Sequence, residues 1–159
     1  VKDQTLKLEH SLVSLSKWES KWHKAFLGRE PKTQEESIDY IRCMTLTQNV
    51  NPDVYKAITP QTEREVFAYI NAPMTATTFP PDDKNRPNRK IVTAEIIYYW
   101  MICENIPFEC QKWHLNRLMT LINVCRAENA PRKKMSKKEI MARNRALNAS
   151  RRRKTHSRG

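Results

Sequence analysis

Glycine is nearly absent from this chain of 159 residues, which contains only Gly28 and Gly159. Loops that cradle phosphate groups need glycine so that backbone N–H groups can approach the ligand. Two-residue hairpin turns depend on glycine as well. The scarcity of glycine therefore argues against a P-loop or dinucleotide-binding fold, and it favours an all-α protein.

The features of an exported or membrane-spanning protein are also missing. The first residues do not combine a basic start with an apolar run, so we expect no signal peptide. No apolar run approaches the roughly 20 residues that a helix needs to cross a bilayer. The sequence predicts a soluble protein that is made in a cytosol and does not contact a membrane.

Motifs for catalysis or metal binding are equally scarce. The four cysteines form no C-x-x-C pair, and we expect four buried, reduced thiols. One histidine and three cysteines could be drawn as a zinc set, but their spacing matches no common structural zinc pattern: Cys103, Cys110, His114 and Cys125. No glycine elbow or oxyanion site accompanies Cys110 and His114. The sequence thus predicts no enzyme, no metal site and no cofactor.

Positive charge, by contrast, is abundant and unevenly placed. Residues 131–159 contain 12 Lys and Arg residues and one acidic residue, a net charge of +11 out of the +12 of the whole chain. Residues 1–130 contain 17 basic and 16 acidic residues, a net charge of +1. We therefore divide the chain into a helical domain over residues 1–130 and a basic C-terminal tail over residues 131–159.

Apolar spacing and capping signals predict a compact domain of about five helices after a short N-terminal extended arm. The alternating segment TLKLEHSLV (5–13) predicts the arm. Capping boxes at Ser16–Glu19 and Thr33–Glu36, together with the Thr59-Pro60 pair, predict helix starts. The five main helices are expected over residues 16–26, 33–48, 59–71, 93–105 and 107–129, and a short additional helix over residues 54–58. Leu46 is expected among the inward-facing residues of the helix over 33–48.

Aromatic residues recur at helical spacing near the N-terminus. Trp18, Trp22 and Phe26 are four residues apart, which places them on one face of a helix. The first interpretation is a stripe that faces the core, and the alternative is an exposed anchor for a partner. The candidate partner-binding residues are Trp18, Trp22, Phe26 and Trp113.

The basic tail combines a predicted helix with a predicted disordered end. A third capping box at Ser136–Glu139 starts a helix over about 137–149, and the last ten residues are expected to be disordered without a partner. The tail has no aromatic residue, so any nucleic-acid binding should be non-specific neutralisation of phosphates rather than base stacking. A solvated tail that keeps the protein soluble is the alternative. The candidate basic contacts are Arg132, Lys133, Lys134, Lys137, Lys138, Arg143, Arg145, Arg151, Arg152, Arg153 and Lys154.

Several segments of the chain resemble a family of small proteins encoded by tailed bacteriophages and prophages. They include SLVSLSKWESKWHKAFL, YIRCMTLTQNVNPDVY, FECQKWHLNRL and MSKKEI, and the resemblance spans residues 8–155. The family's setting in the tail gene cluster resembles that of the tail assembly chaperones of long-tailed phages. Those small helical proteins bind the tape-measure protein until the tail tube polymerises around it. The resemblance brings no catalytic residue and no cofactor.

The resemblance implies a chaperone that binds the tape-measure protein or other tail components in the host bacterial cytoplasm, with self-association left open. One alternative is a structural virion protein of the tail or of the head–tail region. Another is a non-specific nucleic-acid-binding protein that acts through the basic tail.

Overall fold

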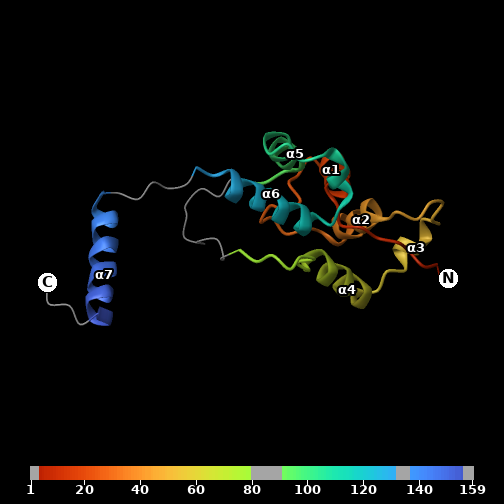
Figure 1. The fold of residues 1–159 in the computed structure, drawn as a ribbon. Coiled ribbons are helices and arrows are strands. Elements are labelled where there is room, and N and C mark those ends of the chain that lie inside the picture. Colours follow the sequence, from red (N-terminus) through yellow and green to blue (C-terminus); the bar gives the residue numbers. More distant parts are fainter. Residues whose placement is uncertain (1–3, 80–90, 132–136, 156–159) are drawn as a thin grey trace. The chain divides into compact units, whose positions relative to one another are not determined.

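The computed structural model describes residues 4–79, 91–131 and 137–155, and within these ranges it contains helices and no named strand (Figure 1). The predicted all-α class is confirmed. The chain divides into two units, Val1–Glu128 and Asn129–Gly159. The elements are α1 (Leu12–Trp22), α2 (Gln34–Met44), α3 (Asp53–Lys56), α4 (Pro60–Asn71), α5 (Ala94–Cys103), the 3₁₀-helix η1 (Phe108–Lys112), α6 (Leu115–Asn129) and α7 (Lys137–Thr155).

The segment before α1 is extended and pairs with two distant parts of the chain. Leu8 forms an antiparallel bridge with Thr45, directly after α2. Ser11 forms a second antiparallel bridge with His114, directly before α6. The N-terminal segment therefore links the end of α2 to the start of α6.

Helix α1 begins five residues earlier than the sequence predicts, because its N-cap is Ser11 and not Ser16. Ser11 is extended (φ −121°, ψ 167°) and accepts the N–H of Ser14, while the Ser14 hydroxyl accepts the N–H of Ser11. The predicted capping box at Ser16–Glu19 is wrong, because both residues lie inside the helix. The helix stops at Trp22, since His23 adopts the left-handed conformation (φ 53°).

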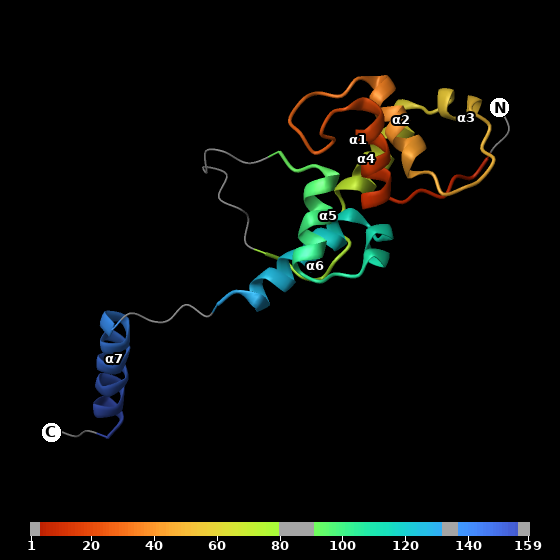
Figure 2. The same ribbon diagram turned by 90° about the horizontal axis from the view of Figure 1, so that it is seen from above.

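Aromatic packing joins α1 to α2. Trp18 is buried, and its indole N–H donates to the Glu36 carbonyl oxygen at 2.9 Å. Phe26 lies beyond the end of α1, and its ring stacks on Tyr40 with 3.6 Å between ring centroids. Helix α1 also packs against α5 and η1, and Figure 2 shows it next to α2 and α5. The core interpretation of Trp18 and Phe26 is confirmed, although Phe26 reaches the core from a loop.

The second and fourth helices begin where the sequence predicts. Thr33 and Glu36 form the expected capping box of α2, and Thr59 caps α4 with Pro60 as its first residue. Helix α2 ends at Met44 rather than near residue 48, because the next residue is extended and pairs with the N-terminal segment. Leu46, expected to face inward, is 60% exposed.

The single helix predicted over residues 107–129 is two elements. Trp113 is extended (φ −73°, ψ 162°) between η1 and α6, where the backbone of His114 pairs with Ser11. The first backbone N–H of α6, that of Leu115, donates to the His10 carbonyl oxygen at 2.7 Å. The N-terminal segment thus supplies a hydrogen bond that the preceding turn would supply in a continuous helix. For this reason the domain of about five predicted helices has six α-helices and η1 among its described residues.

The basic helix α7 is longer than predicted, since it continues to Thr155. The predicted disorder is therefore wrong for residues 150–155. The predicted cap Ser136 and the basic residues Arg132, Lys133 and Lys134 lie outside the described residues, as do residues 156–159.

We predict that Ser11→Ala lowers the free energy of unfolding by about 1 kcal/mol, because the cap of α1 is lost. The matched control is Ser16→Ala, which changes an interior helix position and should shift stability by less than about 0.5 kcal/mol. Urea unfolding followed by tryptophan fluorescence measures both values. Equal losses in the two variants would contradict the assigned cap.

Candidate functional site

The four aromatic residues predicted to bind a partner do not form one surface. Trp18 and Phe26 lie in the core and offer no surface to a partner. Trp22 is partly buried, and its indole N–H donates to the Asp39 carboxylate at 2.8 Å. Trp113 is exposed, with the guanidinium of Arg117 4.4 Å from its ring centroid. A binding role stays a prediction for Trp22 and Trp113 only.

An exposed apolar surface lies instead on α5 and η1. Tyr99 and Ile102 are 63% and 60% exposed. Tyr98 precedes Ile102 by four residues, so the two share a side of the helix, and its ring centroid lies 6.3 Å from that of Phe108, which is 52% exposed. We name these four residues the α5 patch: Tyr98, Tyr99, Ile102 and Phe108. Contiguous exposed apolar surface commonly marks an interaction site.

Hydrogen bonding fixes one side chain of the α5 patch. The Tyr98 hydroxyl donates to the side-chain oxygen of Gln111 at 2.8 Å, which ties α5 to η1. Burial raises the pKa of Tyr98, and the nearby Glu95 carboxylate raises it further. The phenol therefore stays neutral, and the α5 patch presents rings and an aliphatic side chain without a charge of its own.

Sequence periodicity could not find the α5 patch. The run AEIIYYWMIC is apolar on almost every side, so it predicts a helix buried on several faces. In the structure only Ala94, Ile97 and Met101 of this helix are buried. Because large apolar residues occupy both faces, with Ile97 buried and Ile102 exposed, the sequence contains no signal that separates the two faces.

A buried polar cluster holds the N-terminal segment in place. The buried His10 ring shares a 2.6 Å hydrogen bond between its Nδ1 and the Tyr40 hydroxyl. Its ring centroid lies 5.1 Å from that of His114. Burial lowers the pKa of His10 to about 4, and charge repulsion from His114 adds to this. His10 is therefore neutral at pH 7, which suits a core position.

The second histidine of this cluster has an assignable tautomer. The Nδ1 of His114 accepts the backbone N–H of Asn116 at 3.3 Å, so its Nε2 carries the proton and donates to the Tyr69 carbonyl oxygen at 3.1 Å. The Tyr69 hydroxyl in turn donates to the Glu9 carboxylate at 2.8 Å. Both ring nitrogens of His114 are used by the protein, so neither is available to a metal ion.

The cysteines that were drawn as a zinc set do not form one. No group of three or more His, Cys, Asp or Glu residues could hold a metal ion in the part of the chain that the structure describes. All four cysteines are free thiols. Cys110 is buried, Cys43 and Cys125 are partly buried and Cys103 is exposed. The expectation of four buried thiols is therefore confirmed in full only for Cys110 and is wrong for Cys103.

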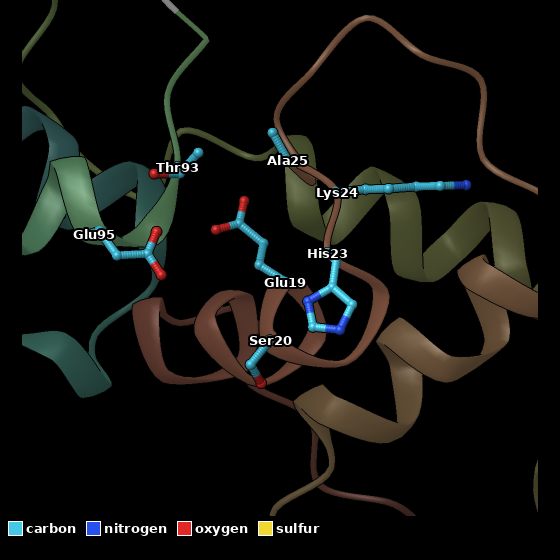
Figure 3. Close-up of a pocket in the computed structure, with 7 residues that line it drawn as sticks. All are labelled: Glu19, Ser20, His23, Lys24, Ala25, Thr93 and Glu95. Atoms are coloured by element: carbon cyan, nitrogen blue, oxygen red, sulfur yellow. The ribbon is translucent and has the colours of Figure 1, made fainter.

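A pocket of about 260 Å³ lies beside the end of α1 (Figure 3). Its buried carboxylate, Glu19, accepts the backbone N–H groups of Phe26 at 2.9 Å and Ala94 at 2.7 Å. Glu19 thereby caps α5, whose own N-cap Thr93 makes no side-chain cap bond. Burial raises the pKa of Glu19 despite these two hydrogen bonds. Since both of its oxygens are occupied by the backbone, Glu19 fixes the loop after α1 and the start of α5.

Comparison with known proteins adds no assignment, because no family model, curated protein or solved structure matches the chain. Among the described residues, no helix is both long enough and apolar enough to cross a membrane.

We predict that the protein loses stability as the pH falls from 6.5 toward 4. The pKa of His10 is near 6.5 in the unfolded chain and about 4 in the folded one, so the unfolded state binds more protons in this range. The contribution of His10 is complete above pH 6.5, and its loss by pH 4.5 amounts to roughly 2–3 kcal/mol.

Chemical unfolding at pH 7.5 and pH 4.5 tests this contribution. His10→Asn keeps a polar group near Tyr40 without the titration, so its stability should depend less on pH by that amount. The control His23→Asn changes an exposed histidine at a left-handed position that asparagine tolerates, and it should keep the wild-type dependence. If the stability of His10→Asn depends on pH as strongly as that of the wild type, then His10 is not the cause of the loss at low pH.

Proposed function

We propose that this chain is a tail assembly chaperone of a tailed bacteriophage, and that its α5 patch binds an amphipathic helical segment of the tape-measure protein. The observation that carries the proposal is that Tyr99, Ile102 and Phe108 are exposed together on α5 and η1. The resemblance of residues 8–155 to proteins of phage tail gene clusters supplies the client.

The chemistry of the α5 patch suits such a client. A helical client inserts the apolar side chains of one face into an apolar surface, with polar groups at the rim. Tyr99, Ile102 and Phe108 are each more than half exposed, and covering each would stabilise the complex by on the order of 1–2 kcal/mol. The cost of association offsets part of this gain. A small surface therefore favours reversible binding, which a chaperone needs because its client must leave for the tail tube.

Two Arg side chains cover other aromatic rings of this unit. Arg126 places its guanidinium 4.3 Å from the ring centroid of Trp100 and also pairs with the Glu104 carboxylate at 3.5 Å. Arg117 covers Trp113 in the same way. These cations lie on rings that would otherwise be more exposed. These two rings are therefore less available to an apolar client than Tyr99 and Phe108 are.

We predict that co-expression with the tape-measure protein of the same phage yields a soluble complex, and that Tyr99→Ser with Ile102→Ser weakens it by about 30- to 900-fold. Affinity capture followed by titration of the purified partners measures the change. The matched control is Leu46→Ser, because Leu46 is 60% exposed, like Ile102, but lies after α2.

The proposal fails if the tape-measure protein is equally soluble alone and no complex purifies. It also fails if Leu46→Ser weakens binding as much as the double variant. Mass spectrometry of purified phage particles tests the alternative of a structural virion protein, since a structural component is present at a regular copy number and a chaperone is absent.

A further inference from the structure

Helix α7 is a continuous, strongly basic helix with no buried surface in its described part. Every residue from 137 to 153 is exposed. The helix contains eight Lys and Arg residues and a single acidic residue, Glu139. The run Arg151–Lys154 belongs to the helix and not to a disordered end, so the backbone at these four residues follows the helix axis.

The cations of α7 surround the helix rather than line one face. Successive residues turn by about 100°. Lys138, Arg145 and Arg152 are seven residues apart and lie along one side. Lys137 and Arg151 lie about 100° away from that side, and a third side holds Arg143 and Arg153. A flat acidic protein surface would contact only one of these three sides.

We propose that α7 is a DNA-binding helix that enters the major groove of duplex DNA and neutralises the phosphates on both walls without reading sequence. An α-helix with its side chains is about 10–12 Å across, which matches the major-groove width of roughly 12 Å. A helix in that groove has phosphates on two flanks, so cations on several sides of the helix can each contact a phosphate. This inference does not depend on the proposed chaperone function.

Duplex DNA fits these residues better than other nucleic acids. Residues 131–159 contain no Phe, Tyr or Trp side chain on which single-stranded bases could stack. The major groove of duplex RNA is too deep and narrow to admit side chains from a helix. The exposed Ile140, Met141 and Leu147 can contact thymine methyl groups, which also lie in the major groove of DNA.

The length and charge of α7 set the expected salt dependence. Nineteen residues span about 28 Å, along which B-DNA presents roughly 16 phosphates. If four to seven cations each neutralise one phosphate, a plot of the logarithm of the DNA association constant against the logarithm of the salt concentration should have a slope of about −4 to −6. Affinity should then drop roughly 10²- to 10⁴-fold between 50 and 200 mM salt.

Fluorescence anisotropy of the full chain with a labelled random-sequence 20-bp duplex tests this inference. We expect the variant Arg151→Ala, Arg152→Ala, Arg153→Ala to reduce the magnitude of the slope by about 3, while alanine preserves the helix. The matched control removes three exposed cations of the other unit, with Lys17→Ala, Arg42→Ala and Lys112→Ala, and should leave the slope unchanged.

Three further measurements separate duplex DNA from other partners. Single-stranded (dT)₂₀ should bind at least 10-fold more weakly than the duplex, and poly-L-glutamate should compete poorly for the same protein. Ile140→Ala with Leu147→Ala should change duplex affinity by less than about threefold, because phosphates provide most of the binding.

The inference is overturned if no duplex binds at 50 mM salt. It is also overturned if the salt slope of the control variant decreases as much as that of the α7 variant. Equal or stronger binding of (dT)₂₀ would exclude a major-groove mode. Strong competition by poly-L-glutamate, together with a large loss in the Ile140→Ala and Leu147→Ala variant, would identify an acidic protein as the partner instead.

Discussion

The pairing of the N-terminal segment with two distant points of the chain is the constraint on which the helical domain depends. Leu8 pairs with Thr45, and Ser11 pairs with His114. Between them, His10 is buried and hydrogen-bonded to Tyr40. These few contacts join the end of α2 to the start of α6 across 30 residues or more of sequence. The neutral state of His10 is part of this constraint, because a charged imidazole in that position would be costly.

The same pairing decides which surface the domain exposes. Because His114 is extended where it meets Ser11, the long apolar segment after Pro107 cannot be one helix and is divided into η1 and α6. The short η1 leaves Phe108 next to Tyr98 and partly in solvent. The position of Phe108 in the α5 patch therefore depends on the pairing of His114 with Ser11, which follows the other end of η1. Glu19 helps to position the patch as well, because it accepts the Ala94 N–H in the first turn of α5.

The two units of the chain offer different kinds of binding surface. The α5 patch belongs to a unit with little net charge and offers apolar area, whose effect depends weakly on salt. Helix α7 belongs to the other unit and offers charge, whose effect depends strongly on salt. The proposed binding of a tail protein by the α5 patch and the proposed binding of DNA by α7 can thus be perturbed separately.

The sequence by itself determined the all-α class, the starts of α2 and α4 and the concentration of charge after residue 130, because capping boxes, proline at a first helical position and net charge are local properties. Only the tertiary structure decided the start of α1, the break before α6 and the exposure of Tyr99 and Ile102. The break is set by bridges between residues far apart in the sequence. The exposed face of α5 is set by which side packs against the core, and a helix that is apolar all round does not encode that choice.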